Sequence, residues 1–278
     1  MREEAKGRWM ILLAGVLWSL AGVFIKSLEL HPLTIVFYRS LFASLSFLLF
    51  ARPARWTFSS SLLVSAASYT AAISFFVSAN KLTTAANAII LQYTAPIFVF
   101  LFVRLLFREP ILKPNLLALL IGMAGVAVIF IGSAGEPDSA GVVVAVLSGL
   151  FFAVFMTNLR FLRAVDTGYL TLVNNLACCL VLLPLAPSLS LSAREALTLA
   201  VMGVVQLGIP YFLFSKGLER ISLQEASLIV LIEPVLNPTW VALAFGEMPS
   251  VATFFGGGMI LLSLGFRYLW LLFSKSDR

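Results

Sequence analysis

Ten long apolar runs, separated by short polar connections, occupy most of this sequence. A helix needs about 20 mainly apolar residues to cross the hydrocarbon core of a bilayer, whereas the strands of a membrane barrel alternate in polarity over about 10 residues. The runs are continuous and therefore favour helices. They cover residues 9–25, 33–51, 62–79, 85–107, 116–131, 140–159, 170–186, 197–214, 223–245 and 251–273. The pattern predicts an all-α polytopic membrane protein with ten transmembrane helices.

The composition agrees with this prediction and disfavours several other classes of protein. Of the 278 residues, 60% are hydrophobic and 12% are charged, whereas about a quarter of the residues of a soluble domain are charged. A water-soluble enzyme, a disordered chain and a nucleic-acid-binding domain are therefore poor interpretations. The first run follows the basic residues 1–8, but it lacks an A-x-A-like cleavage site, so we expect it to remain in the mature protein.

The Lys and Arg residues are distributed unevenly between alternate connections. Only Lys26, Lys81 and Arg194 fall on one side of the predicted bundle, and Arg39 lies inside the second run. The other side collects Arg2, Lys6, Arg8, Arg52, Arg55, Arg104, Arg108, Lys113, Arg160, Arg163, Lys216, Arg220, Arg267, Lys275 and Arg278. Because cytoplasmic loops carry the excess of basic residues, both termini are expected in the cytoplasm.

The sequence has no pattern of metal or cofactor ligands. Cys178 and Cys179 are adjacent, which is neither a CxxC spacing nor a disulfide framework, and His31 is the only histidine. The glycine run at residues 256–258 lies in a hydrophobic span and lacks the lysine of a P-loop. We therefore expect no metal, no cofactor, no nucleotide hydrolysis and no catalytic residues.

The second half of the chain repeats the first at an offset of 138 residues. Pro96 in the fourth run aligns with Pro234 in the ninth, and thirteen residues beyond each proline Glu109 aligns with Glu247. The matching pairs also include Ala88 with Ala226, Val103 with Val241, Leu105 with Leu243 and Phe107 with Phe245. A mid-span proline followed by a glutamate at the membrane exit is a stronger signal than apolar matches. The repeat predicts two domains of five spans each, residues 1–133 and 140–278.

An odd number of spans in each half reverses the orientation of the second half in the membrane. Two similar halves of opposite orientation are related by a pseudo-two-fold axis in the membrane plane. Such a molecule can present one central site to either face by exchanging the conformations of its halves. The repeat therefore predicts alternating access.

Two stretches of the repeat carry a resemblance to a known family. In residues 87–109 the sequence NAIILQYTAP leads to RE, and in residues 225–247 the sequence EA leads to IEP and then to GE. With ten spans in two halves, they resemble the EamA branch of the drug/metabolite transporter (DMT) superfamily. The resemblance implies an inner-membrane carrier, commonly an exporter of amino acids or related metabolites, with cytoplasmic termini. It also implies a central cavity lined mainly by helices one, three, four, six, eight and nine, and a structural role for Glu109 and Glu247.

Two charged side chains lie well inside predicted spans, where an unpaired charge is costly. Glu233 stands halfway along the ninth run and is expected to face the bundle interior. It either couples proton movement to transport, binds a substrate ammonium, or is a structural carboxylate held by a base or hydroxyl. Arg39, six residues into the second run, either meets a substrate carboxylate, forms an internal ion pair or anchors at head groups. The sequence leaves open whether Arg39 and Glu233 pair.

Prolines inside the runs are candidate hinges. Pro96 and Pro234 each remove the hydrogen bond to the carbonyl four residues earlier, at Gln92 and Val230, and should kink their helices. A freed carbonyl at membrane depth is tolerated when it faces a cavity or a polar partner, so we favour cavity-lining hinges over accommodated kinks. The further hinge candidates are Pro210 and Pro238.

Polar and aromatic residues inside the runs complete the candidate binding site. Glu233, Asn237 and Trp240 share one helical face, which is the best candidate for a wall of the substrate site. Trp18 lies deep in the first run among small residues, where its indole can stack on a ligand or fill a gap. A single polar residue more often forms a hydrogen bond between helices, which contributes about 0.6 kcal/mol to their association. Together, however, these residues favour a polar pathway. The remaining candidates are Tyr69, Asn87, Gln92, Thr94, Asn174, Gln206 and Tyr211.

These features favour a secondary transporter that moves a small metabolite outward by alternating access. One acidic and one basic intramembrane residue suit a zwitterion, so amino acids or related amphipathic solutes are the expected substrates. The alternative is proton-coupled efflux of lipophilic cations or drugs, for which Glu233 alone would suffice. From other classes, a polytopic membrane enzyme would need an interfacial His, Asp or Ser cluster that the sequence does not show, and a non-transporting receptor would not require the repeat. The expected partners are the small-molecule substrate, the lipid bilayer and a coupling proton, and no nucleic acid.

Overall fold

A computed structural model describes residues 2–50, 58–108, 113–132, 139–162, 164–221, 226 and 229–276, and the elements within these ranges are helices. The first half contains α1 (Arg2–Ser19), α2 (Ala21–Lys26), α3 (Pro32–Phe50), α4 (Ser60–Leu82), α5 (Ala85–Gln92), α6 (Ala95–Phe107) and α7 (Lys113–Gly132). The second half contains α8 (Ser139–Asn158), the 3₁₀ turn η1 (Leu159–Leu162), α9 (Thr167–Leu182), α10 (Ala193–Val201), the π-helical segment η2 (Met202–Gly208), α11 (Ile209–Leu218), α13 (Glu233–Phe245) and α14 (Val251–Ser276).

Five of the predicted runs form helices long and apolar enough to cross a membrane, counting the described residues alone. They are Glu3–Lys26, Ser60–Leu82, Ala85–Phe107, Ser139–Leu162 and Ala193–Phe214. Four other runs form shorter apolar helices, namely Pro32–Leu48, Leu116–Gly132, Gly168–Leu182 and Val251–Phe266. The ninth run is helical from Glu233 to Phe245, and most of residues 222–228 lie outside the description. The all-α polytopic fold class is confirmed, while the count of ten spans stays a prediction.

Side-chain caps explain where several helices begin. Each capping side chain accepts a hydrogen bond from the backbone N–H three residues later. The caps are Ser59 before α4, Thr84 before α5, Asp166 before α9 and Ser192 before α10. A cap of this kind satisfies a donor that the first helical turn leaves unpaired, and it stabilises the helix by about 1 kcal/mol. The short polar connections therefore define where the apolar helices start.

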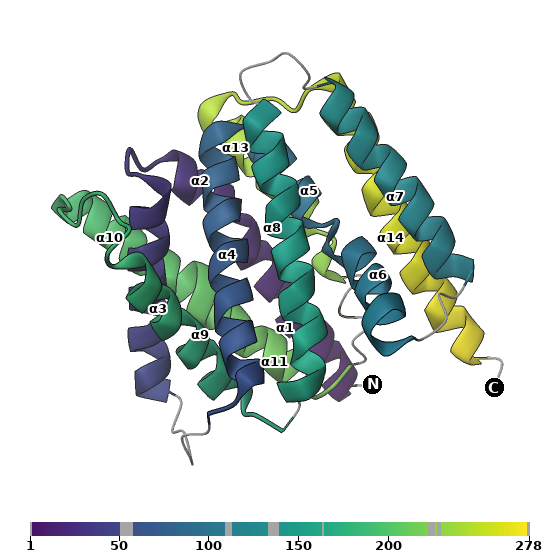
Figure 1. The fold of residues 1–278 in the computed structure, drawn as a ribbon, viewed down its shortest axis with the longest axis horizontal. Helices are drawn as coiled ribbons and strands as arrows, with labels where there is room; N and C mark the ends of the chain where they lie inside the picture. The colour runs from purple at the N-terminus through teal and green to yellow at the C-terminus, as the bar shows by residue number, and fades with distance from the viewer. Residues whose placement is uncertain are drawn as a thin grey trace.

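The offset of 138 residues also relates the helix boundaries. α6 covers residues 95–107 and α13 covers residues 233–245, so both begin and end at equivalent positions, and α14 begins 138 residues after α7. The residues that end α6 and α13, Arg108 and Gly246, are the two with positive φ in the described part of the chain, at 56° and 71°. Figure 1 shows α6 in the half of the bundle nearer the chain ends and α13 in the opposite half. The equivalent helices thus lie as an inverted repeat requires.

Helices from both halves of the sequence pack into one bundle. α4 lies along α8, α3 packs against α9 and η2, and α1 packs against α11 (Figure 1). α7 and α14 lie side by side at one edge and contact the rest of the bundle chiefly through α5 and α6. The largest buried apolar cluster joins the halves, since it includes Ile35, Ile89, Leu182 and Ile260. The predicted domain boundary, between residues 133 and 140, falls mostly outside the described ranges and stays a prediction.

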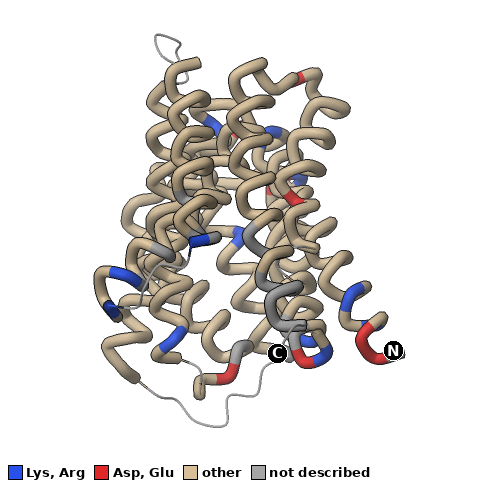
Figure 2. The backbone as a smooth tube through the Cα atoms, turned by 90° about the vertical axis from the view of Figure 1, so that its right-hand side faces the viewer, with Lys and Arg blue, Asp and Glu red and all other residues tan. Residues whose placement is uncertain are grey.

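Basic residues gather at the end of the bundle where the two chain ends lie (Figure 2). Lys26 and Lys81, which the sequence assigns to the other side, end α2 and α4 at the opposite end of the bundle (Figure 1). The arrangement in space is therefore the one that the uneven distribution of Lys and Arg along the chain predicts.

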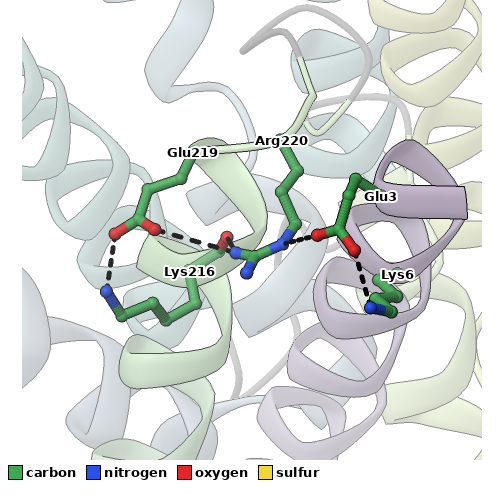
Figure 3. A network of polar contacts seen from close by, with 5 residues as sticks. All are labelled: Glu3, Lys6, Lys216, Glu219 and Arg220. Carbon is green, nitrogen blue, oxygen red and sulfur yellow. Dashed lines mark hydrogen bonds and ion pairs between the residues drawn. The ribbon is translucent and has the colours of Figure 1, made fainter.

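At the end that carries the termini, an ion-pair network joins the start of α1 to the end of α11 (Figure 3). Arg220 lies 3.2 Å from Glu3 and 3.7 Å from Glu219. Lys6 pairs with Glu3 at 2.6 Å, and Lys216 pairs with Glu219 at 2.7 Å. The hydrogen bond from Lys216 lowers the pKa of the Glu219 carboxyl, and the charges of Lys216 and Arg220 lower it further. Because both carboxylates are largely exposed, salt screens this network and its effect on stability is small.

Candidate functional site

The interrupted fourth and ninth spans meet at their breaks. The fourth span is broken at Tyr93 and Thr94, between α5 and α6, and the ninth is broken at Leu231 and Ile232, just before α13. These positions are again 138 residues apart. The Tyr93 hydroxyl lies 2.8 Å from Oε2 of Glu233. Tyr93, at the break in the fourth span, therefore contacts Glu233, the first residue of α13 after the break in the ninth span.

The missing N–H of Pro234 explains a second contact of Tyr93. Because proline cannot donate, the carbonyl of Val230, four residues earlier, loses its helical partner. The Tyr93 hydroxyl lies 3.2 Å from this carbonyl oxygen and can donate either to it or to Glu233. The equivalent Pro96 lies in the first turn of α6, where proline is well tolerated. The ninth span thus presents a freed carbonyl and a carboxylate to one hydroxyl from the other half.

The carboxylate of Glu233 lies at a helix N-terminus inside the bundle. It belongs to the first turn of α13, and the partial positive charge of a helix N-terminus favours an anion there. The residue is half-buried, and within the described part of the chain no Lys or Arg pairs with it. Its contact with a hydroxyl is compatible both with proton or ammonium binding and with a structural role.

The break in the fourth span lies directly against α8 at Gly149. A Cβ on Gly149 would come 2.7 Å from Oγ1 of Thr94 and 2.9 Å from the carbonyl oxygen of Leu91, so a larger residue would force the two helices apart. Thr94 donates to the Leu91 carbonyl at 2.6 Å, and Gln92 donates to Oγ of Ser148 at 2.8 Å. The site candidates Gln92 and Thr94 therefore support the shape of the break in this conformation.

An aromatic cluster comes from the first and eighth spans. The Trp18 ring meets the Tyr211 ring edge-on, with 5.3 Å between the centroids, and lies at the same centroid distance from Phe214. Gln206 donates to the Trp18 carbonyl at 3.4 Å, and Oε1 of Gln206 is buried without a partner. Tyr211 lies near Arg39 of α3 and Glu233 of α13. The cluster is therefore near both intramembrane charges.

Arg39 of α3 is buried, and no counter-ion lies beside it among the described residues. The residue is 3% exposed, and its Nε and Nη1 are buried without a hydrogen-bond partner. Its electrostatic neighbours are Tyr69, Cys178 and Tyr211, side chains that are ordinarily neutral at pH 7. In this conformation Arg39 and Glu233 do not form an ion pair, and the buried guanidinium does not reach the bundle surface.

The face of α13 that continues from Glu233 contacts the first span. Trp240 donates from Nε1 to Oγ of Ser19 at 3.0 Å. Asn237 is fully buried against Gly22, and neither atom of its amide has a hydrogen-bond partner. In this conformation, α1 and α2 therefore cover the face that we expect to form a wall of the substrate site.

The other two prolines lie in different settings. Pro210 is in the first turn of α11, directly after η2, whereas Pro238 is inside α13. η2 packs closely on α3, where a Cβ on Gly203 would come 2.7 Å from the Arg39 carbonyl oxygen. Wide π-helical turns are frequent at functional positions. Pro210 therefore follows an irregular segment that lies beside the buried base.

Three predicted site residues join neighbouring spans through hydrogen bonds. The bonds link Asn87 with Thr83 at 3.0 Å and with Thr253 at 2.6 Å, Asn174 with Ser65 at 3.1 Å, and Tyr69 with Asn175 at 3.3 Å. They connect the fourth span to the tenth and the third span to the seventh. Such bonds between helices are the alternative role that the sequence allowed for single polar residues.

At the end of the bundle opposite to the termini, Glu247 joins the two halves. Its carboxylate lies 2.7 Å from Nζ of Lys26 and accepts a hydrogen bond from the backbone N–H of Ala85 at 2.6 Å. Nearby, Lys81 donates to the Leu28 carbonyl. We call the contacts of Glu247 with Lys26 and Ala85 the latch. The latch holds the ends of the first, fourth and ninth spans together.

Two hollows of the described part of the chain lie away from the charged residues of the interior. One, of about 250 Å³, is at the latch end of the bundle and is lined by Ser27, Leu28, Glu29, Ser192, Arg194, Glu195 and Thr198. The other, of about 370 Å³, lies between α7 and α14 and is almost entirely apolar. The central cavity stays a prediction. Within the described ranges, no three His, Cys, Asp or Glu side chains come together as metal ligands.

Sequence reasoning missed Tyr93 and Lys26 as members of these arrangements. Tyr93 belongs to the repeated stretch, but one tyrosine in an apolar run has no periodic signal. The available clue was its position three residues before Pro96. At the offset of 138 residues, this position is equivalent to Leu231, which lies at the break before α13. Two members of the sequence repeat, Glu109 and Glu225, lie outside the described residues.

The sequence matches the model of the EamA-like transporter family twice, at residues 5–131 and 139–268. The chain belongs to the EamA-like transporter family. This family is part of the DMT superfamily, and membership identifies the protein as a multi-pass membrane transporter. The two matches fall on the two halves that the internal repeat predicts.

Relatives of this EamA-like transporter cover most of its length. An uncharacterized transporter from Archaeoglobus fulgidus is 28% identical over 257 residues, covering 92% of this chain and 93% of that protein. An uncharacterized transporter in the sor 3′ region of Acidianus ambivalens is 22% identical, covering 69% of this chain and 74% of that protein. A solved crystal structure matches with a TM-score of 0.68 at 19% identity, over 96% of this chain and 98% of its own, and supports the fold. The relatives are named as transporters and not as enzymes.

Proposed function

We propose that this EamA-like protein is a secondary transporter that exports amino acids or related small metabolites by alternating access. The observation that carries the proposal is the contact between Tyr93 and Glu233, which joins two equivalent helix breaks from opposite halves. In secondary transporters with inverted repeats, interrupted helices supply both the binding groups and the hinges. A movement of one half relative to the other would change this contact and the site beside it together.

Two features support amino acids or related solutes as the substrates. Glu233 and Arg39 carry opposite charges in the interior and are not paired with each other. Trp18 and Tyr211 add an aromatic surface near both charges that suits an apolar side chain. In this proposal residues 1–133 and 140–278 are the moving halves. The protein lies in the inner membrane with both termini in the cytoplasm, and protons are the candidate coupling ion.

Counterflow in liposomes tests the transport activity directly. Purified protein is reconstituted into liposomes that contain a high concentration of one unlabelled amino acid, and uptake of the same labelled amino acid is followed. Transient accumulation is expected for at least one amino acid of a complete panel. The Tyr93→Phe variant keeps the ring and removes the hydroxyl, and a hydrogen bond to a charged group contributes about 1.5 to 3 kcal/mol. We expect it to slow exchange by about 10-fold or more. Absence of counterflow across the panel would refute amino-acid transport.

The aromatic cluster also supports a second candidate function, proton-coupled efflux of lipophilic cations. The ring faces of Trp18 and Tyr211 attract organic cations, and Glu233 alone can exchange a proton for a cation. This function does not need Arg39. Proton release stimulated by an added cation such as tetraphenylphosphonium, unchanged by Arg39→Gln, would favour it over amino-acid export.

A further inference from the structure

Arg39 is buried, and none of the acidic side chains that the structure describes pairs with it. Arg39 lies seven residues after Pro32, the first residue of α3, which places it about 10 Å along the helix. Its side chain stays inside the bundle, because the residue is 3% exposed and two guanidinium nitrogens are buried. It therefore neither reaches a lipid head group nor pairs with an acid in the described part of the chain.

Two of the side chains around Arg39, Tyr69 and Cys178, form hydrogen bonds with other partners. The hydroxyl of Tyr69 donates to Asn175 at 3.3 Å. The Cys178 sulfur accepts a hydrogen bond from Ser40 at 3.5 Å. Nε and Nη1 of Arg39 remain without any acceptor. A charged group that is buried with two of its donors unpartnered is costly, and an anion from outside the chain would reduce that cost.

We propose that Arg39 is an internal anion site that binds the carboxylate of the transported solute. The planar guanidinium presents donors in the geometry of a carboxylate, and such pairs are stronger than neutral hydrogen bonds. The neighbours of Arg39, which are Tyr69, Cys178 and Tyr211, are not basic. The site therefore has a single positive charge, which a ligand with a single negative charge balances. A monocarboxylate therefore fits better than a phosphate dianion. This inference rests on the proposed transport function and narrows its substrates to solutes with a free carboxylate.

The site has a consequence for the ligand-free protein. A residue retained only to bind an anion should lower the stability of the empty protein, whereas a structural residue should raise it. We therefore expect Arg39→Gln to have a melting temperature equal to or higher than that of the wild type when no ligand is present. The matched control is Arg104→Gln, since Arg104 carries the same charge on an exposed part of α6.

The experiment is a thermal-shift titration of the purified full-length protein at constant ionic strength. The probes are acetate, benzoate, glycine and L-phenylalanine, each compared with its uncharged carboxamide counterpart and with chloride. At least one carboxylate should raise the melting temperature saturably in the wild type and in Arg104→Gln, while its carboxamide and chloride should not. In Arg39→Gln the apparent affinity should fall by about 10- to 100-fold, and Arg39→Lys should restore part of it.

Several results would overturn the carboxylate site. They are equal shifts by a carboxylate and its carboxamide, equal shifts by chloride, no shift with any carboxylate, an unchanged shift in Arg39→Gln, or a lower melting temperature of ligand-free Arg39→Gln. Because binding is measured without flux, the two proposals can fail separately. Carboxylate binding that depends on Arg39, without counterflow, would refute only the transport proposal. Counterflow with an unchanged rate in Arg39→Gln would refute only the anion site.

Discussion

Neutralising Glu247 should shift this transporter toward a conformation that is open at the latch end. Glu247 holds Lys26 at 2.7 Å and the N–H of Ala85 at 2.6 Å. The side chains of the ion pair are 19% and 24% exposed, so the pair is stronger than a surface pair of about 0.2 to 1 kcal/mol but is still partly screened. Alternating access requires the ends of the first and ninth spans to separate in one state. The contacts of Glu247 then contribute only to the closed state.

The size of the effect follows from what each substitution removes. Glu247→Gln keeps an acceptor for Ala85 but loses the charge, which costs the closed state about 1 to 2 kcal/mol. A difference of this size changes the ratio of closed to open molecules by about 5- to 30-fold. Glu247→Ala also removes the hydrogen bond, and it should cost the closed state about 2 to 4 kcal/mol.

Electron paramagnetic resonance distances can measure this shift. Nitroxide labels on Glu29→Cys and Met248→Cys report on the two sides of the latch, since both positions are exposed. The native Cys178 and Cys179 are buried. Glu247→Gln should increase the population at longer label distances. The control Glu219→Gln removes a carboxylate at the opposite end and should leave the distribution unchanged. The same distance distribution in wild type and Glu247→Gln would refute the assignment of the latch to one state.

Further substitutions test the break, the proton and the exposed network. Glu233→Gln should remove the pH dependence of transport measured in liposomes at a series of pH values; retention of both rate and pH dependence would exclude proton coupling. Gly149→Val should lower the unfolding free energy by about 1 to 3 kcal/mol through overpacking, seen as a lower melting temperature, whereas Gly258→Val, with open space around its Cβ, should not. The lowered pKa of Glu219 means that its contribution to stability is present above the usual value of about 4.3 and is lost as the pH falls through the lowered pKa. A carbon-13 NMR titration should find this lower midpoint, and Lys216→Gln should move it back up; an unchanged midpoint would contradict the assigned cause.

Much of the fold can be predicted from the sequence because a bilayer imposes strict demands on the chain. Backbone groups in hydrocarbon must be paired internally, so long continuous apolar runs can only be helices. The offset that aligns Pro96 with Pro234 also predicts equivalent helix boundaries, since proline and its neighbours determine where each span breaks.

The partners of the polar residues could be decided only by the tertiary structure. Helical periodicity assigns a residue to a face, but it does not say which of several helices covers that face. Asn87 and Glu233 are both polar residues in equivalent spans, yet packing gives Asn87 hydrogen bonds to Thr83 and Thr253 and brings Glu233 to Tyr93. Arg39 is recognisable from the sequence as a costly base inside a span. That it has no counter-ion depends on side chains supplied by helices distant in the chain, and no local pattern encodes their meeting.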